Sequence, residues 1–168
     1  MTKLAFDIRP AAPFDASAIA SIHEAAWDNS YRGIIPHKTL TSMIARRGPQ
    51  WWEKALNASN SVLVANIGGK IAGYATLGRN RTRALEQRGE IYELYLRPEY
   101  QGLGFGNRLF NAAHARLKDF GLKGLVVWAL EDNSRAMGFY EAIGGKDIAE
   151  GTETFEGRHL RKIAFGWN

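Results

Sequence analysis

The sequence predicts a mixed α/β domain built around one central sheet. β-rich runs alternate with stretches in which apolar residues recur at helical spacing. Residues 61–79, SVLVANIGGKIAGYATLGR, place two β-rich runs on either side of Gly68-Gly69, a favoured hairpin turn. Residues 124–130, GLVVWAL, form a continuous apolar run, as expected of a strand buried on both faces. The 168 residues correspond to a single domain, residues 1–168.

The N-terminal part is expected to be mainly helical after one short strand. Residues 6–11, FDIRPA, are β-rich and end at a proline. The first helix follows with Asp15 as its N-cap, because a short polar side chain suits that position. We expect this helix to break at Gly33 and a short second one to begin at Pro36. Residues 48–57, GPQWWEKALN, predict a further helical segment.

The C-terminal part alternates strands and helices. Residues 90–96, EIYELYL, predict a strand that stops before Pro98, and the helix after it is expected to be capped by Gly121. Residues 132–145, DNSRAMGFYEAIGG, predict a second helix that ends at a glycine pair. Two late strands are expected within 150–167, joined near Glu156-Gly157.

Composition excludes several classes of protein. With no cysteine there are no disulfides, thiolate metal ligands or thiol nucleophiles, which fits a cytoplasmic protein. No apolar run is long enough for a membrane span, so we expect no membrane association. The histidines lack metal-ligand spacing, so no metal is expected; they are His23, His37, His114 and His159.

The net charge of +5 favours anionic partners. The most basic segment, residues 79–88, RNRTRALEQR, has no interleaved aromatic residues on which bases could stack. A solvated loop is therefore the better interpretation, and no nucleic-acid partner is expected. A phosphorylated cofactor accounts for the positive charge equally well.

Three glycines, Gly102, Gly104 and Gly106, stand between a predicted strand and a predicted helix. Bare backbone there, with the free N–H groups of the helix start, forms a seat for a pyrophosphate, and Arg108 adds a full charge. A P-loop would need Gly-Lys-Ser/Thr, which is absent. A dinucleotide fold would need GxGxxG and an acidic residue such as Glu131, but the spacing here is GxGxG. A glycine-rich turn without a ligand is the simplest alternative.

Three motifs together resemble the GNAT (GCN5-related N-acetyltransferase) superfamily, in particular its bacterial members of small-molecule type. Gln101, Gly104 and Gly106 match the motif Gln/Arg-x-x-Gly-x-Gly/Ala, after a strand ending in YLRPEYQGLG. The segment EDNSRAMGFYEAIGG resembles the second motif of the family, and AAWDNSYRGIIP resembles its first helical hairpin. The resemblance implies the GNAT fold, a central, mostly antiparallel sheet flanked by helices.

The resemblance also implies a co-substrate, acetyl-CoA, and the residues that hold it. Backbone groups of the strand that ends at Leu96 would bind the pantetheine arm as an added strand. The glycine loop and the first residues of the helix would hold the pyrophosphate. The implied cofactor-binding residues are Leu94, Tyr95, Leu96, Gln101, Gly102, Leu103, Gly104, Phe105, Gly106, Asn107, Arg108, Asn133 and Tyr140.

Direct acetyl transfer to an amine needs an acid for the departing thiolate and a base for the amine. The resemblance assigns the acid to Tyr140, although a core tyrosine remains an alternative. Glu90 and Glu93 are candidates for the base, and resemblance favours Glu90. Because the pKa of a carboxylate lies far below that of an amine, such a base would need burial or an ordered water. Their spacing of three puts the two side chains on opposite faces unless a bulge intervenes.

The first helical hairpin is expected to line the acceptor site through Trp27, Tyr31 and Arg32. We expect the acceptor to be a small-molecule amine. A protein N-terminus or lysine is an alternative acceptor, and an acyl-CoA-binding module without catalysis is an alternative function. The late strands, 146–167, could supply the edge of a homodimer.

Overall fold

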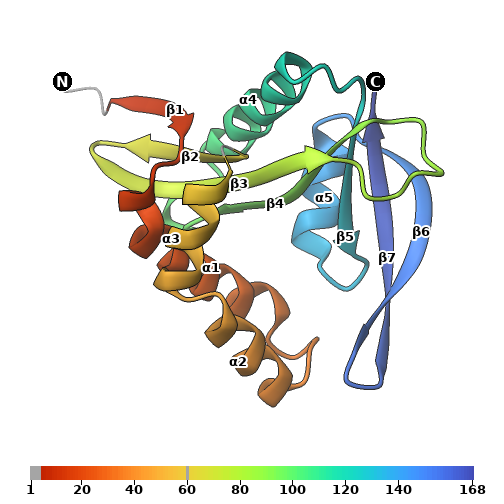
Figure 1. Cartoon of the computed structure of the whole chain (residues 1–168). Helices are drawn as coiled ribbons and strands as arrows, with labels where there is room; N and C mark the ends of the chain where they lie inside the picture. Colours follow the sequence, from red (N-terminus) through yellow and green to blue (C-terminus); the bar gives the residue numbers. More distant parts are fainter. Residues whose placement is uncertain (1–4, 60) are drawn as a thin grey trace.

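The computed structural model describes residues 5–59 and 61–168. Seven strands form one sheet in the order β1-β2-β3-β4-β5-β7-β6, in which every neighbouring pair is antiparallel except β4 and β5 (Figure 1). The predicted fold class is therefore confirmed. The strands are β1 (Phe6–Pro10), β2 (Val62–Ile67), β3 (Lys70–Arg79), β4 (Gly89–Leu96), β5 (Leu125–Leu130), β6 (Lys146–Phe155) and β7 (Arg158–Trp167).

The helices cover both faces of this sheet (Figure 1). Side chains of α4 and α5 pack with one face of β3, β4 and β5, whereas α1 and α3 pack on the other face of β2 and β3. Strand β2 contributes side chains to both faces, because successive residues of a strand point to opposite sides. Leu63 and Ala65 pack on the side of α4 and α5, and Val62 and Val64 pack on the side of α1 and α3. The helices are α1 (Ala16–Tyr31), α2 (His37–Arg46), α3 (Pro49–Ala58), α4 (Phe105–Asp119) and α5 (Ser134–Ala142), with 3-10 turns η1 (Pro13–Asp15) and η2 (Pro98–Tyr100).

Most predicted elements are confirmed within a few residues. The β2–β3 turn has positive φ at both Gly68 and Gly69, as a two-residue hairpin turn requires, and Gly121 follows α4 with φ of 77°. Helix α5 is shorter than predicted, and β6 begins before residue 150, at Lys146. No helix within the two described ranges is long and apolar enough to cross a membrane.

Strands β4 and β5 touch only at their beginnings. Their parallel pairing consists of Gly89 with Leu125 and Glu90 with Val126, after which the strands diverge. Glycine allows this contact, because a Cβ on Gly89 would lie 3.0 Å from the carbonyl oxygen of Gly124. The sheet therefore opens into a gap along the second half of β4.

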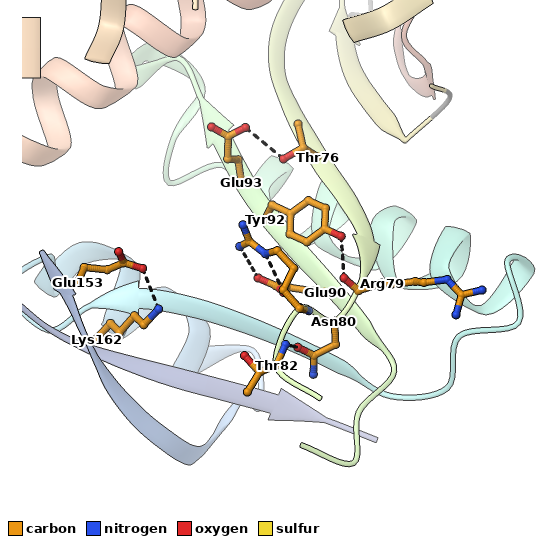
Figure 2. Close-up of polar contacts among 10 residues, drawn as sticks. Thr76, Arg79, Asn80, Thr82, Glu90, Tyr92, Glu93, Glu153 and Lys162 are labelled. Atoms are coloured by element: carbon orange, nitrogen blue, oxygen red, sulfur yellow. Dashed lines mark hydrogen bonds and ion pairs between the residues drawn. The ribbon is translucent and has the colours of Figure 1, made fainter. Parts of the chain in front are cut away.

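A β-bulge shapes the same strand. Thr76 of β3 is paired with Glu93, but Leu77 is paired with Ile91, so Tyr92 is an extra residue on β4. Its hydroxyl donates to the carbonyl oxygen of Arg79 at 2.6 Å (Figure 2). Because a bulge shifts the alternation by one residue, side chains three apart across it share a face.

Asp15 stands at the N-cap of α1, as predicted, but its carboxylate does not cap the helix. It is buried, receives both terminal nitrogens of Arg9 at 2.8 and 2.9 Å, and accepts the N–H of Ala12 at 2.8 Å. Burial alone would raise the pKa of this carboxyl, but the hydrogen bonds and the charge of Arg9 outweigh it and hold the pKa below its ordinary value. The pair ties β1 to the start of α1.

Replacing Asp15 by asparagine keeps the shape and removes the charge. Hydrogen bonds to charged groups contribute about 1.5–3 kcal/mol, and each kcal/mol moves Tm by about 2–4 °C in a chain of this size. We expect Asp15→Asn to lower Tm by roughly 3–12 °C at pH 7, measured by calorimetry. The exposed Asp147, changed to asparagine, is the control and should leave Tm nearly unchanged.

The loss of Tm in Asp15→Asn should depend on pH, and the direction of this dependence follows from the lowered pKa of Asp15. Because the pKa of Asp15 is lowered by folding, its stabilisation is complete above the ordinary aspartate value of about 3.9. It is lost as the pH falls through the lowered pKa of the folded state. The Tm difference between wild type and Asp15→Asn should therefore narrow below about pH 4; a constant difference down to pH 3 would contradict this account.

Candidate active site

A cavity of about 550 Å³ lies where β4 and β5 diverge. Its walls come from α1, the second half of β4, the loop that leads into α4, β5 and α5. The predicted cofactor residues that line it are Leu94, Tyr95, Leu96, Gln101, Gly102, Gly104, Gly106, Asn107, Asn133 and Tyr140. The fold thus brings ten of the thirteen together around one opening.

The three glycines of the loop serve two different purposes. Gly102 and Gly104 have φ of 77° and 86°, a left-handed backbone that strains other residues. Gly106 lies in α4, where a Cβ would come within 3.3 Å of the Phe139 ring. The first helical hydrogen bond of α4 runs from Arg108 N–H to the Gly104 carbonyl at 3.2 Å. The N–H groups of residues 105–107 precede it and are free for an anion.

The open edge of β4 supplies backbone groups as well. Arg97 N–H donates to the Ala72 carbonyl of β3, so by alternation Leu94 and Leu96 direct their backbone groups away from β3, toward the gap. The side-chain amide of Gln101 donates to the Leu96 carbonyl at 3.0 Å. Its own oxygen Oε1 is buried and has no partner within the described residues.

Three predicted cofactor residues lie outside this cavity. Leu103 is exposed, the Phe105 ring stacks on Phe6, and the Arg108 guanidinium lies 3.8 Å from the centre of the Phe6 ring. Arg135 of α5, which the motif reading missed, lines the cavity and is exposed. Asn133 caps α5 by accepting the Ala136 N–H at 3.2 Å. Arg135 follows two residues later, and this position next to the cap is the signal that could have identified it.

A second cavity of about 570 Å³ lies between the helices α1–α3 and the β6–β7 hairpin. It shares a wall with the first cavity. Six residues line both, and they are Tyr31, Tyr92, Glu93, Tyr95, Trp128 and Ala129. The two cavities therefore meet where the sheet opens.

The bulge at Tyr92 places Glu90 and Glu93 on the same face, the possibility that the spacing had left open. Only Glu93 lines the cavities. Its carboxylate receives both terminal nitrogens of Arg47 at 2.7 and 2.8 Å. It also accepts the Thr76 hydroxyl at 3.1 Å (Figure 2). Arg47, far away in the sequence and without a motif around it, could not have been foreseen.

Glu90, the residue that resemblance favoured as base, lies behind the wall of the second cavity. It is 1% exposed, accepts the Arg81 N–H at 3.0 Å and pairs with the Arg81 guanidinium at 2.7 Å. Arg81 itself lines the second cavity and covers Glu90 from that side. The structure does not bring Glu90 into contact with either cavity.

Tyr140 of α5 lies at the wall of the first cavity, packed against Phe139, Phe165 and Trp167. Its hydroxyl makes no hydrogen bond to a described residue. Burial raises the pKa of this phenol above its ordinary value, and the nearby Tyr31 adds to the effect. Tyr140 therefore keeps its proton at neutral pH and faces the cavity as a donor.

Of the three predicted acceptor residues, Tyr31 lines both cavities and Trp27 lines the second. Arg32 lines neither and pairs with Asp28 on the surface. The buried His23 stacks near Trp27, with ring centres 5.1 Å apart, and burial lowers its pKa to about 4. Within residues 5–59 and 61–168, no three His, Asp or Glu side chains gather as metal ligands would.

Comparison with known proteins identifies the family. The sequence model described as "Acetyltransferase (GNAT) family" matches residues 18–144, which is most of the chain. The chain belongs to the GNAT family. It is therefore an acetyl-CoA-dependent N-acetyltransferase, as the motifs predicted.

Curated relatives extend the GNAT match over nearly the whole chain. "Uncharacterized N-acetyltransferase YuaI" of Bacillus subtilis is 28% identical over 160 residues, covering 95% of this chain and 91% of YuaI. "Probable N-acetyltransferase Rv2775" of Mycobacterium tuberculosis is 32% identical over 163 residues, covering 93% and 87%. Both relatives are named as N-acetyltransferases.

Solved structures confirm the GNAT fold. PaiA N-acetyltransferase of Thermoplasma acidophilum, in complex with coenzyme A, has a TM-score of 0.74 at 21% identity, with 94% of this chain and 98% of that chain covered. YncA of Salmonella typhimurium, with its cofactor acetyl-CoA, has a TM-score of 0.67 at 22% identity, with 97% and 93% covered. At these identities the likeness concerns the fold alone.

The first cavity fits acetyl-CoA on its own features. Free N–H groups at the start of α4 suit the pyrophosphate, and the cationic Arg135 stands at the same opening. The edge of β4 that faces the gap suits an extended amide chain, and Gln101 Oε1, which has no partner in the part of the chain that the structure describes, offers an acceptor. These groups would suit an anion, an amide and a hydroxyl, the polar groups of the cofactor.

A charge placed at Gly104 should separate binding from folding. A Cβ there meets open space, and aspartate and asparagine both tolerate its left-handed backbone better than most residues. Two like charges 4 Å apart repel by about 4 kcal/mol at an effective dielectric near 20, before salt screening. We expect Gly104→Asp to bind acetyl-CoA at least about tenfold more weakly than the isosteric Gly104→Asn.

Isothermal calorimetry at two salt concentrations measures the difference in acetyl-CoA affinity between Gly104→Asp and Gly104→Asn. The two variants share the backbone strain, so equal Tm values show that folding is the same in both. The gap in affinity should shrink as salt rises, because screening weakens the repulsion. Equal affinities for the two variants at low salt would place the pyrophosphate elsewhere.

Proposed function

We propose that this acetyltransferase moves the acetyl group of acetyl-CoA directly to the primary amine of a small molecule. The observation that supports this is the shared wall of the two cavities. An amine in the second cavity and a thioester in the first would meet beside Glu93, Tyr31 and Tyr95 without a covalent enzyme intermediate.

The size of the second cavity supports a small acceptor. Its 570 Å³ lies within the range of small-molecule sites, about 300–1,000 Å³. Thr39 of α2 donates to Glu156 at the tip of the β6–β7 hairpin at 2.7 Å, which closes α2 against the hairpin. An extended protein segment would need an open groove. The Thr39–Glu156 contact instead joins α2 to the β6–β7 hairpin, two of the elements that line this cavity.

The residues of the wall have distinct proposed roles. Acetyl-CoA, when bound, supplies a thioester that an amine can attack. Tyr140 holds a proton at its Oη, because burial raises the pKa of the phenol and keeps it neutral. It would donate a hydrogen bond to the sulfur that leaves, so that the thiolate takes this proton as the C–S bond breaks. Glu93 accepts a hydrogen bond from the incoming amine and orients it. Glu90 acts as a positioning residue that holds Arg81.

Glu93 is better suited to orient the amine than to take its proton directly. An ordinary alkylamine has a pKa near 10.4 and an ordinary glutamate near 4.3, so direct transfer from the ammonium is strongly uphill. The Arg47 pair also occupies both carboxylate oxygens. An amine that enters in its neutral form, or a proton that leaves through water, avoids this difficulty.

The acceptor size can be tested by release of CoA from acetyl-CoA. We expect small primary amines to give a kcat/KM at least about tenfold above peptides with a free N-terminus or lysine, because the size of the cavity and the Thr39–Glu156 contact favour a small acceptor. The measurement compares both sets at matched amine concentration. Faster turnover of a peptide would replace the small-molecule proposal by a protein acceptor.

Replacing Tyr140 by phenylalanine tests the acid. The ring and its packing remain, and the lost hydroxyl has no partner among the described residues, so Tm should stay within a few degrees of wild type. We expect kcat to fall by about 10²- to 10⁴-fold, the usual effect of losing a general acid. Affinity for acetyl-CoA should change much less.

Tyr74 provides a matched control. It is also a buried tyrosine whose hydroxyl has no partner in the described ranges, but it lines neither cavity. Tyr74→Phe should keep full kcat. If Tyr140→Phe behaves like Tyr74→Phe, the proton for the thiolate comes from another source.

A further inference from the structure

Four of the five tryptophans of the chain line the second cavity. Trp27 comes from α1, Trp51 and Trp52 from α3, and Trp128 from β5. The fifth, Trp167, lies apart and donates to the Ile143 carbonyl. Tyrosines and Phe155 add to the same wall. Residues far apart in sequence thus build an aromatic lining around the place where an acceptor would sit.

One of these rings is open to a ligand. Trp51 is 44% exposed, although a large aromatic side chain is stabilised most by burial. Its neighbour Trp52 is 1% exposed and meets it edge to face, with ring centres 5.0 Å apart. An exposed ring on a concave wall gives a flat, apolar ligand a large contact area at low entropic cost.

The charges around the cavity are already matched. Arg47 pairs with Glu93, and Lys162 pairs with Glu153 at 2.7 Å (Figure 2). The third cation, Arg81, covers the buried Glu90. Each carboxylate of this wall therefore has its own cation. The second ammonium group of a diamine or polyamine would find no unpaired carboxylate on this wall, whereas a monoamine that enters in its neutral form needs none.

Cations that lie over the tryptophan rings connect the aromatic lining to Glu93, where the amine would react. The Arg47 guanidinium holds Glu93 and also lies over the rings of Trp51 and Trp52, at 4.6 and 4.7 Å from their centres. An amine at Glu93 would therefore have its body beside these two rings. Trp128, under Lys162 at 4.6 Å, lines both cavities and closes the opposite side.

We propose that the acceptor is a primary monoamine joined to an aromatic ring through a short alkyl chain. The amine lies at Glu93 and the ring lies against Trp51. This inference rests on the proposed function and adds the class of its substrate. The four tryptophans account for the ring, and the paired carboxylates account for the single charge.

Three probes isolate the two features. 2-Phenylethylamine and butylamine differ by the ring, and butylamine and 1,4-diaminobutane differ by the second charge. We expect kcat/KM for 2-phenylethylamine to exceed that for butylamine at least tenfold, with 1,4-diaminobutane the poorest. CoA release measures turnover, and calorimetry measures binding of each amine in parallel.

A variant pair tests the contact. Trp51→Leu should lower kcat/KM for 2-phenylethylamine about tenfold more than it lowers kcat/KM for butylamine. Phe120→Leu, at an exposed aromatic residue of similar exposure outside both cavities, is the control and should change neither. Tm measurements exclude a general loss of folding.

The outcomes separate the inference from the proposed function. Amines acetylated without preference for the ring, or best when dicationic, would overturn the inference and keep the function. Equal losses on both amines in Trp51→Leu would also overturn it. A lack of turnover of every amine, even with ring-selective binding, would overturn the proposed function and the inference with it.

Discussion

The short contact between β4 and β5 is the constraint on which the rest of the site depends. Two residue pairs, held close by Gly89 and Gly124, join the strands, and beyond Glu90 the hydrogen bonding stops. A sheet that stayed paired would have buried the backbone of Leu94 and Leu96. Because it opens, the edge of β4 is free and both cavities reach the same wall.

The bulge at Tyr92 makes this opening chemically useful. One extra residue shifts the alternation of β4, so that Ile91 and Leu94 both face the core with α4, while Glu90 and Glu93 face the other side. Two carboxylates on one face would repel each other. Arg81 and Arg47 each take one of them, which fixes Glu90 in the interior and leaves Glu93 at the wall.

The sequence alone determined the order of the elements, because hydrophobic periodicity and turn glycines are local signals. The structure forms β2 and β3 within residues 61–79 and β5 within residues 124–130, with bounds close to the predicted ones. The motif around Gly104 and the one around Asn133 likewise determined much of the lining of the first cavity, since each motif is a short segment whose residues lie close together.

Only the tertiary structure decided the acceptor side. Trp51, Arg47 and Trp128 carry no motif, and they meet because α3, the turn between α2 and α3, and β5 converge on the bulged strand. The same holds for the choice between Glu90 and Glu93, since a one-residue bulge has no local signature in EIYELYL. Which side chains share a cavity depends on long-range packing and register, and neither is encoded in the spacing of one segment.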